Sequence, residues 1–164
     1  MKLVFILEEI SIKRSGIPFF GIRFDVWKLG PVSKDLYIEL SEDPNLLNEF
    51  IKKEFRDGKT LISPRREFSD DEFSDSELEL LEQVSERFKY CSAQELINFT
   101  HRKESPWYIT AQQHGLVETL ESGQVNATNI EIDFTTIIAD QEDKLARYKG
   151  HSEFLHQTKI LKDH

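Results

Sequence analysis

The chain has 164 residues, a net charge of −9 and a single cysteine, Cys91. This length fits one domain, which buries roughly 70% of the surface that its unfolded chain exposes and needs neither a disulfide nor a metal to hold a core. The charge argues against nucleic acid as the main partner, because each phosphate contact needs a Lys or Arg, and the lone cysteine favours a reducing compartment.

The apolar run near the N-terminus does not predict a membrane segment. Residues 3–7 are apolar, but Glu8 and Glu9 interrupt the run after five residues. A bilayer span needs about 20 apolar residues, and the basic leader of a signal peptide is missing. We therefore expect a cytoplasmic protein that is not anchored in a membrane.

The first 40 residues show helical periodicity that is broken by turns. Residues 2–13 predict a helix, and residues 19–22 predict a short extended piece. Helical periodicity resumes around Phe24 and Trp27, stops at the turn formed by residues 30–31, and restarts toward residue 40. Residues 24–40 contain no metal ligand set and no phosphate-binding loop. They are typical of a packing signature, which favours a binding module over an enzyme.

The next segment predicts a helix followed by a turn and a hairpin. Asp43-Pro44 is a good helix start, because Asp caps free N–H groups and Pro is tolerated in the first turn. Apolar residues then recur at helical spacing over residues 47–55. Asp57-Gly58 predicts a tight turn, and a small β-hairpin element is expected around residues 60–69.

Helix signals dominate the second half of the chain. Ser74 with Glu77, and Ser92 with Glu95, both fit the capping-box pattern. Ser105-Pro106 starts a further helix, which Gly115 stops. Beyond these helices, a polar link is expected over residues 121–129 and a helix over residues 134–148, ended by Gly150, with only a weak final helix over residues 152–161.

These patterns predict a mainly α fold, a compact single-domain helical bundle with one small β-hairpin element. We expect a domain over residues 1–150 and a C-terminal helical tail over residues 151–164 that could pack on it.

Residues 67–86 are strongly acidic, with nine Asp or Glu and no Lys or Arg. Such a run is usually a solvated loop that leads into a helix. The alternative is a docking face for a basic partner, where complementary charge speeds encounter more than it deepens affinity. The candidate steering residues of this acidic face are Asp70, Asp71, Glu72 and Asp75.

No pattern in the chain indicates catalysis or a metal. Zinc needs three or four converging ligands, and the histidines have no His-x-x-x-His spacing. There is no Gly-x-Ser-x-Gly elbow and no Gly-rich phosphate loop, and Cys91 has no activating partner. We expect no enzyme, no metal and no cofactor. The five histidines are His101, His114, His151, His156 and His164.

Four aromatic residues each allow two interpretations. Trp27, Tyr37 and Trp107 lie at helical spacing, which usually indicates core residues, although exposed Trp and Tyr are frequent interface anchors. His101 follows a capped helix, where it could bond to free carbonyls and interact with the helix dipole, or contact a partner.

Two motifs together resemble those of a bacterial and phage family. One resembles a Trp-x-x-Gly-Pro-Val…Tyr signature and the other a Ser/Thr-x-x-Leu…Thr-His…Trp pattern. The resemblance spans roughly residues 2–148, and residues 2–5 are similar to the family's Lys-Leu-Leu-Tyr helix. The family is the Panacea domain of SocA-like antitoxins and phage-associated GepA proteins. The matching residues are Trp27, Gly30, Pro31, Val32, Tyr37, His101 and Trp107.

The resemblance implies a mainly helical domain that neutralises a cognate protein toxin by binding it. Members share a scaffold but pair with unrelated toxins, so we interpret the matching residues as fold determinants that could also reach an interface. The toxin could be basic, and a homodimer is left open. The alternatives are a proteolytic adaptor, a phage accessory protein that inhibits or delivers a host protein, and an enzyme with an unrecognised site. Members usually carry a helix before the segment that resembles residues 2–5, and residues 151–164 could replace it.

Overall fold

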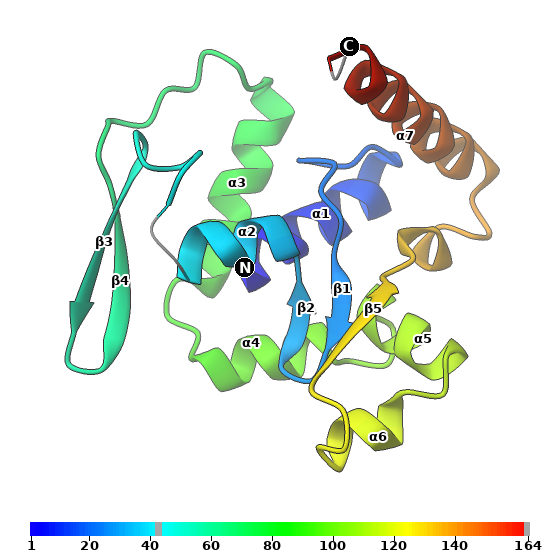
Figure 1. Cartoon of the computed structure of the whole chain (residues 1–164). Coiled ribbons are helices and arrows are strands. Elements are labelled where there is room, and N and C mark those ends of the chain that lie inside the picture. Colours follow the sequence, from blue (N-terminus) through cyan, green and yellow to red (C-terminus); the bar gives the residue numbers. More distant parts are fainter. Residues whose placement is uncertain (42–43, 163–164) are drawn as a thin grey trace.

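A long N-terminal helix, α1 (Lys2–Ser15), lies at the centre of the fold (Figure 1). The computed structural model describes residues 1–41 and 44–162 of the chain. Side chains on opposite sides of α1, such as Phe5 and Leu7, are buried in two different apolar clusters. A helix that is apolar around its circumference belongs in an interior. The helix predicted over residues 2–13 is therefore confirmed, and the other elements pack around it.

A small antiparallel sheet lies beside α1 and has the strand order β2-β1-β5. Strands β1 (Asp25–Trp27) and β2 (Gly30–Val32) form a tight hairpin in which Trp27 pairs with Gly30. Strand β5 (Ala127–Glu131) pairs with the other edge of β1. The central strand β1 is thus paired on one side with a strand that lies about 100 residues away in sequence.

Two predictions fail in this sheet. The helical conformation predicted from the periodicity around Phe24 and Trp27 is wrong, because residues 25–27 form β1. The polar link predicted over residues 121–129 contains the start of β5. Strands this short obtain their hydrogen bonds from partners that a local pattern does not reveal.

Helix α2 (Lys34–Ser41) follows β2, and a second, separate hairpin follows α2. This hairpin consists of β3 (Ile51–Arg56) and β4 (Lys59–Pro64). Asp57 and Gly58 both have positive φ, as a two-residue hairpin turn requires.

The predicted turn and the small β element are confirmed, but the hairpin occupies residues 51–64 instead of residues 60–69. The helix expected over residues 47–55 is wrong, because its second half is β3. Ile51 and Phe55 lie four residues apart, which fits one face of a helix and also one face of a strand. The predicted helix start at Asp43 lies outside the described residues.

Both predicted capping boxes are confirmed. Helix α3 (Asp75–Phe88) begins after Ser74, and helix α4 (Ala93–Thr100) begins after Ser92. In each case the Ser hydroxyl accepts a backbone N–H while a Glu side chain accepts the N–H of the Ser. These reciprocal bonds satisfy donors that a helix start leaves free.

Two shorter helices, α5 (Pro106–Gln113) and α6 (Val117–Glu121), follow α4. The chain then continues through β5 into the 3-10 helix η1 (Phe134–Ile137) and the long helix α7 (Glu142–Lys162).

The two predicted glycine stops behave differently. Gly115 has a φ of 66° and follows the end of α5, as predicted. The predicted stop at Gly150 is wrong, because α7 continues through it. A glycine terminates a helix by adopting the left-handed conformation, and Gly150 is not among the glycines with positive φ.

Two apolar clusters share α1. The first joins α1 to the sheet, α5 and η1, and contains the rings of Phe5, Phe24 and Phe134, whose centroids lie 5.3 to 6.3 Å apart. The second joins α1 to α3 and α4 and includes Ile6 and Val84. The predicted mainly α class with small β elements is confirmed.

Two acidic residues of α1 are buried and hydrogen-bonded. The carboxylate of Glu8 accepts the N–H groups of Phe19, Phe20 and Ile22, and so holds the loop after α1. Glu9 forms an ion pair with Arg102, which follows α4. Burial raises the pKa of both carboxyl groups, although these bonds act in the opposite direction.

None of the helices in the described ranges is both long and apolar enough to cross a membrane.

Candidate functional site

The two sequence motifs meet at a motif junction formed by Trp27, Gly30, His101 and Trp107. The indole N–H of Trp107 donates to the carbonyl oxygen of Trp27 at 3.1 Å, and Trp107 is only 3% exposed. The ring of His101 stacks on that of Trp107, with centroids 3.7 Å apart and planes inclined by 18°. The second motif is therefore fixed to the end of β1 in the first.

Gly30 allows the first motif to approach the end of α4. It has a φ of 112°, and a Cβ placed there would lie 3.2 Å from Oγ1 of Thr100 and 3.8 Å from Nε2 of His101. An L-residue is strained in this conformation and would also crowd the buried Thr100. The local geometry thus explains why position 30 is a glycine.

The other motif residues extend from this junction. Trp27 donates its indole N–H to the carbonyl oxygen of Thr128 at 3.2 Å, and its ring lies 5.5 Å from that of Tyr37. Tyr37 belongs to α2 and is 48% exposed. Pro31 is buried opposite Val26 in β1, and Val32 is half-buried. Of the seven residues, Tyr37 is the one with a largely exposed side chain.

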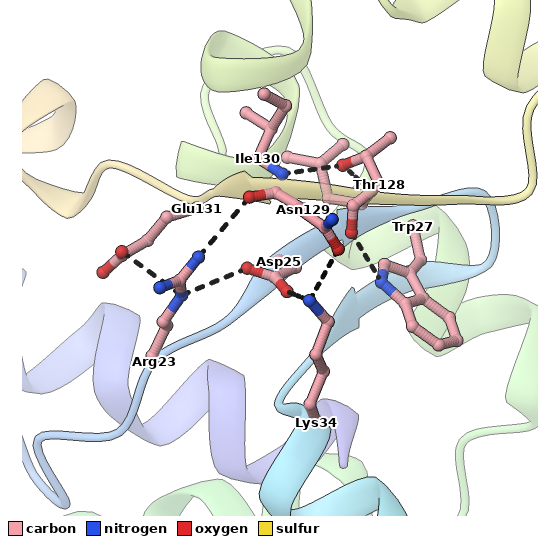
Figure 2. Close-up of polar contacts among 9 residues, drawn as sticks. Arg23, Asp25, Trp27, Lys34, Thr128, Asn129, Ile130 and Glu131 are labelled. Atoms are coloured by element: carbon pink, nitrogen blue, oxygen red, sulfur yellow. Dashed lines mark hydrogen bonds and ion pairs between the residues drawn. The ribbon is translucent and has the colours of Figure 1, made fainter.

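A polar network beside Trp27 connects α2 to the sheet (Figure 2). The carboxylate of Asp25 is 3% exposed and forms ion pairs with Lys34 at 2.8 Å and with Arg23 at 3.3 Å. Lys34 also donates to Oδ1 of Asn129 at 2.7 Å, and Arg23 pairs with Glu131 at 3.3 Å. The network places α2, and with it Tyr37, against β1 and β5.

Our sequence reasoning missed this network. A signal was present in the alternation of Arg23 with Asp25 and of Asn129 with Glu131, since alternate residues of a strand lie on one face. The signal could be used only once β1 and β5 were recognised as neighbouring strands.

His101 is neutral at pH 7, because burial, together with the nearby Lys2, lowers its pKa to about 4. Its Nε2 is buried and has no hydrogen-bond partner in the described part of the chain. A neutral ring cannot act as the cation expected at the negative end of a helix dipole. His101 contributes instead through its stacking on Trp107.

The four residues of the acidic face lie apart from the motif junction. Asp70, Asp71 and Glu72 belong to the loop between β4 and α3, and Asp75 is the first residue of α3. All four are exposed, and no ion pair among the described residues neutralises them. The face is therefore available to a cationic partner.

Within residues 1–41 and 44–162, no three His, Cys, Asp or Glu side chains are grouped so that they could hold a metal ion.

Replacement of Lys34 by Met should lower the free energy of unfolding by about 2 kcal/mol, because the buried carboxylate of Asp25 loses one of its two cations and a charged hydrogen-bond donor. Urea denaturation measures this loss. The double variant Asp25→Asn/Lys34→Met should recover part of it, since no charge is then left buried. Lys59→Met, at the tip of the exposed hairpin, is the matched control. Equal losses for Lys34→Met and Lys59→Met would contradict a structural role of the network.

The protein should lose stability as the pH falls from about 6.5 toward 4 through His101. The pKa of His101 is lowered from 6.5 to about 4 in the folded state, so the unfolded state takes up the proton first as the pH falls. His101→Phe keeps an aromatic ring on Trp107 and removes this titration. Urea denaturation of both proteins across this range should show a steeper loss for the wild type, and parallel pH profiles would contradict the assignment.

Comparison with known proteins places the motif residues in one family. A family model described as "Antitoxin SocA-like, Panacea domain" matches residues 1–108. No match is found among curated proteins or solved structures. The matched region includes all seven motif residues and covers well over half of the chain. The chain therefore belongs to the SocA-like antitoxin family of Panacea domains, as its two motifs predicted.

Proposed function

We propose that this protein is a cytoplasmic antitoxin that neutralises a cognate protein toxin by binding it directly. The match to a family described as SocA-like antitoxins, over residues 1–108, carries the proposal. The use of the motif residues supports it: Trp107 donates to a backbone carbonyl, His101 stacks on Trp107, and Gly30 permits close approach. These contacts build a platform and leave partner choice to the exposed surface.

We also propose that the protein acts by binding and not by catalysis. Catalytic acids and bases usually face a substrate at hydrogen-bond distance and have a pKa near the working pH. His101 is stacked and has a pKa of about 4, and the buried Glu8 is occupied by three backbone N–H groups. Both arrangements stabilise structure.

A direct toxin interface would bury on the order of 1,200–2,000 Å² in total, with a few aromatic or Arg anchors supplying most of the binding energy. Tyr37 is a candidate anchor, because it is 48% exposed while Trp27 and the Asp25–Lys34 ion pair hold its helix in place. The acidic face is a candidate for steering a basic toxin.

A gene adjacent to this one should encode a protein that stops growth when expressed alone and is harmless when co-expressed with this chain. The two purified proteins should form a complex, and the toxin level in rescued cells should stay unchanged. A neighbour that is harmless by itself would contradict the antitoxin function. Rescue accompanied by loss of the toxin would contradict neutralisation by binding and indicate a proteolytic adaptor.

Reversal of the acidic face to Lys at Asp70, Asp71, Glu72 and Asp75 should slow association with the toxin about tenfold at low salt and flatten the salt dependence, because steering depends on complementary charge. Stopped-flow mixing measures both quantities.

The matched control reverses four exposed acidic residues on other elements, which gives the same change in net charge. An association rate unaffected by the first set would contradict steering by this face, and equal slowing by both sets would attribute the effect to net charge alone. The control positions are Glu104, Glu118, Glu121 and Asp140.

A further inference from the structure

The part of the chain between Ser33 and Leu80 has no core of its own. Ser33 and Leu80 are buried, but no described residue between them is buried. This stretch nevertheless exposes several large apolar side chains, of which Phe55 is 79% exposed. Exposed apolar side chains that lie together usually mark an interaction surface. The most exposed of these residues in and beside the hairpin are Leu46, Phe50, Phe55, Leu61, Ile62 and Phe68.

The β3–β4 hairpin has one mainly apolar face and one charged face, which carries four of the five charged residues in the two strands. Cross-strand partners point to the same side of a ribbon, and the pairs alternate between its two sides. One face carries the pairs Ile51–Pro64, Lys53–Ile62 and Phe55–Thr60, and the other carries Lys52–Ser63, Glu54–Leu61 and Arg56–Lys59.

Figure 1 shows the hairpin at the edge of the molecule, beyond α2. An isolated two-stranded ribbon is marginally stable in water, so a partner that packs against one of its faces would stabilise it.

Charge on this part of the chain is sharply divided. Residues 51–66 contain six Lys or Arg and two acidic residues, a net charge of +4 in a chain of net charge −9. Residues 67–86 immediately afterwards contain nine acidic residues and no Lys or Arg.

Among the described residues, no ion pair joins the two segments. The ion pairs of the hairpin cations in the described residues go to Glu49, Glu54 and Asp57. Each chain thus exposes both halves of a complementary pair of surfaces.

We propose that the hairpin docks against a second copy of the chain. In this dimer a two-fold axis places the charged face of each hairpin on the acidic face of the other copy. A two-fold interface uses the same patch twice, so one complementary pair of surfaces on the chain gives two equivalent contacts. The cations of this charged face, Lys52, Arg56 and Lys59, then meet the exposed carboxylates of the other copy.

The test uses the purified full chain and does not depend on the toxin. Light scattering after size exclusion should give twice the monomer mass of 19.2 kDa at micromolar concentration. High salt should shift the population toward monomers, whereas Phe55→Ser, on the opposite face of the ribbon, should leave the dimer intact. A wild type that stays monomeric at high concentration would overturn the proposal, including the case in which the hairpin binds only the toxin.

A charge exchange makes the test specific for the contact. The hairpin variant Lys52→Glu/Arg56→Glu/Lys59→Glu and the acidic-face variant Asp70→Lys/Asp71→Lys/Glu72→Lys should each be monomeric, because like charges then meet at both contacts. Their mixture should form a dimer with one copy of each, because both contacts become attractive again.

Misfolding of either variant is checked by circular dichroism and thermal melting, and restored dimerisation itself requires that both fold. Two variants that fold and do not associate on mixing would overturn the proposed contact. The control Glu104→Lys/Glu118→Lys/Glu121→Lys should keep the wild-type dimer, and its loss would also overturn the contact, since net charge would then govern association.

Discussion

The hydrogen bond from the indole of Trp107 to the carbonyl oxygen of Trp27 joins parts of the chain that lie 80 residues apart. It contributes about 1 kcal/mol as a net interaction, and its loss would cost more because the carbonyl would stay buried without a donor. Trp27 forms the end of β1, and Trp107 lies in the first turn of α5. The position of α5, the stacking of His101 and the close approach at Gly30 all depend on this contact. The residues of the family signature that meet here therefore determine how β1 packs against α5.

The central helix α1 imposes the second constraint. Because apolar clusters cover it on two sides, its two internal carboxylates must be satisfied by neighbouring elements. Glu8 accepts hydrogen bonds from three N–H groups of the loop that leads into the sheet. Glu9 forms an ion pair with Arg102, which directly follows His101. The same helix that supplies apolar contacts to both clusters thus also fixes the entry to β1 and the end of α4. Carboxyl groups of one helix thus hold both the segment that leads into β1 and the segment that follows α4.

Features that depend on local chemistry could be predicted from the sequence, and features that depend on distant partners could not. The capping boxes at Ser74 and Ser92 need only residues three positions apart, and both are present. Strand β1 could not be recognised, because it depends on β5, which lies about 100 residues away. The same gap concealed the contact between Lys34 and Asn129. The two motifs were recognisable as residue patterns, but the bond between the two Trp residues could be seen only in three dimensions.

The buried side chains and the surfaces proposed for binding lie in different parts of the chain. The buried side chains of the described residues lie in residues 1–33 and 80–138, whereas α2, the hairpin and the acidic face contain none. Both the proposed toxin steering and the proposed dimer contact use Asp70, Asp71 and Glu72. One carboxylate cannot face a toxin and the hairpin of a second copy at the same time, so dimerisation and toxin binding through this face exclude each other. By mass action, a toxin that binds only the monomer pulls the dimer apart. The dimer would then cover the acidic face of the free chain until a toxin displaces the second copy.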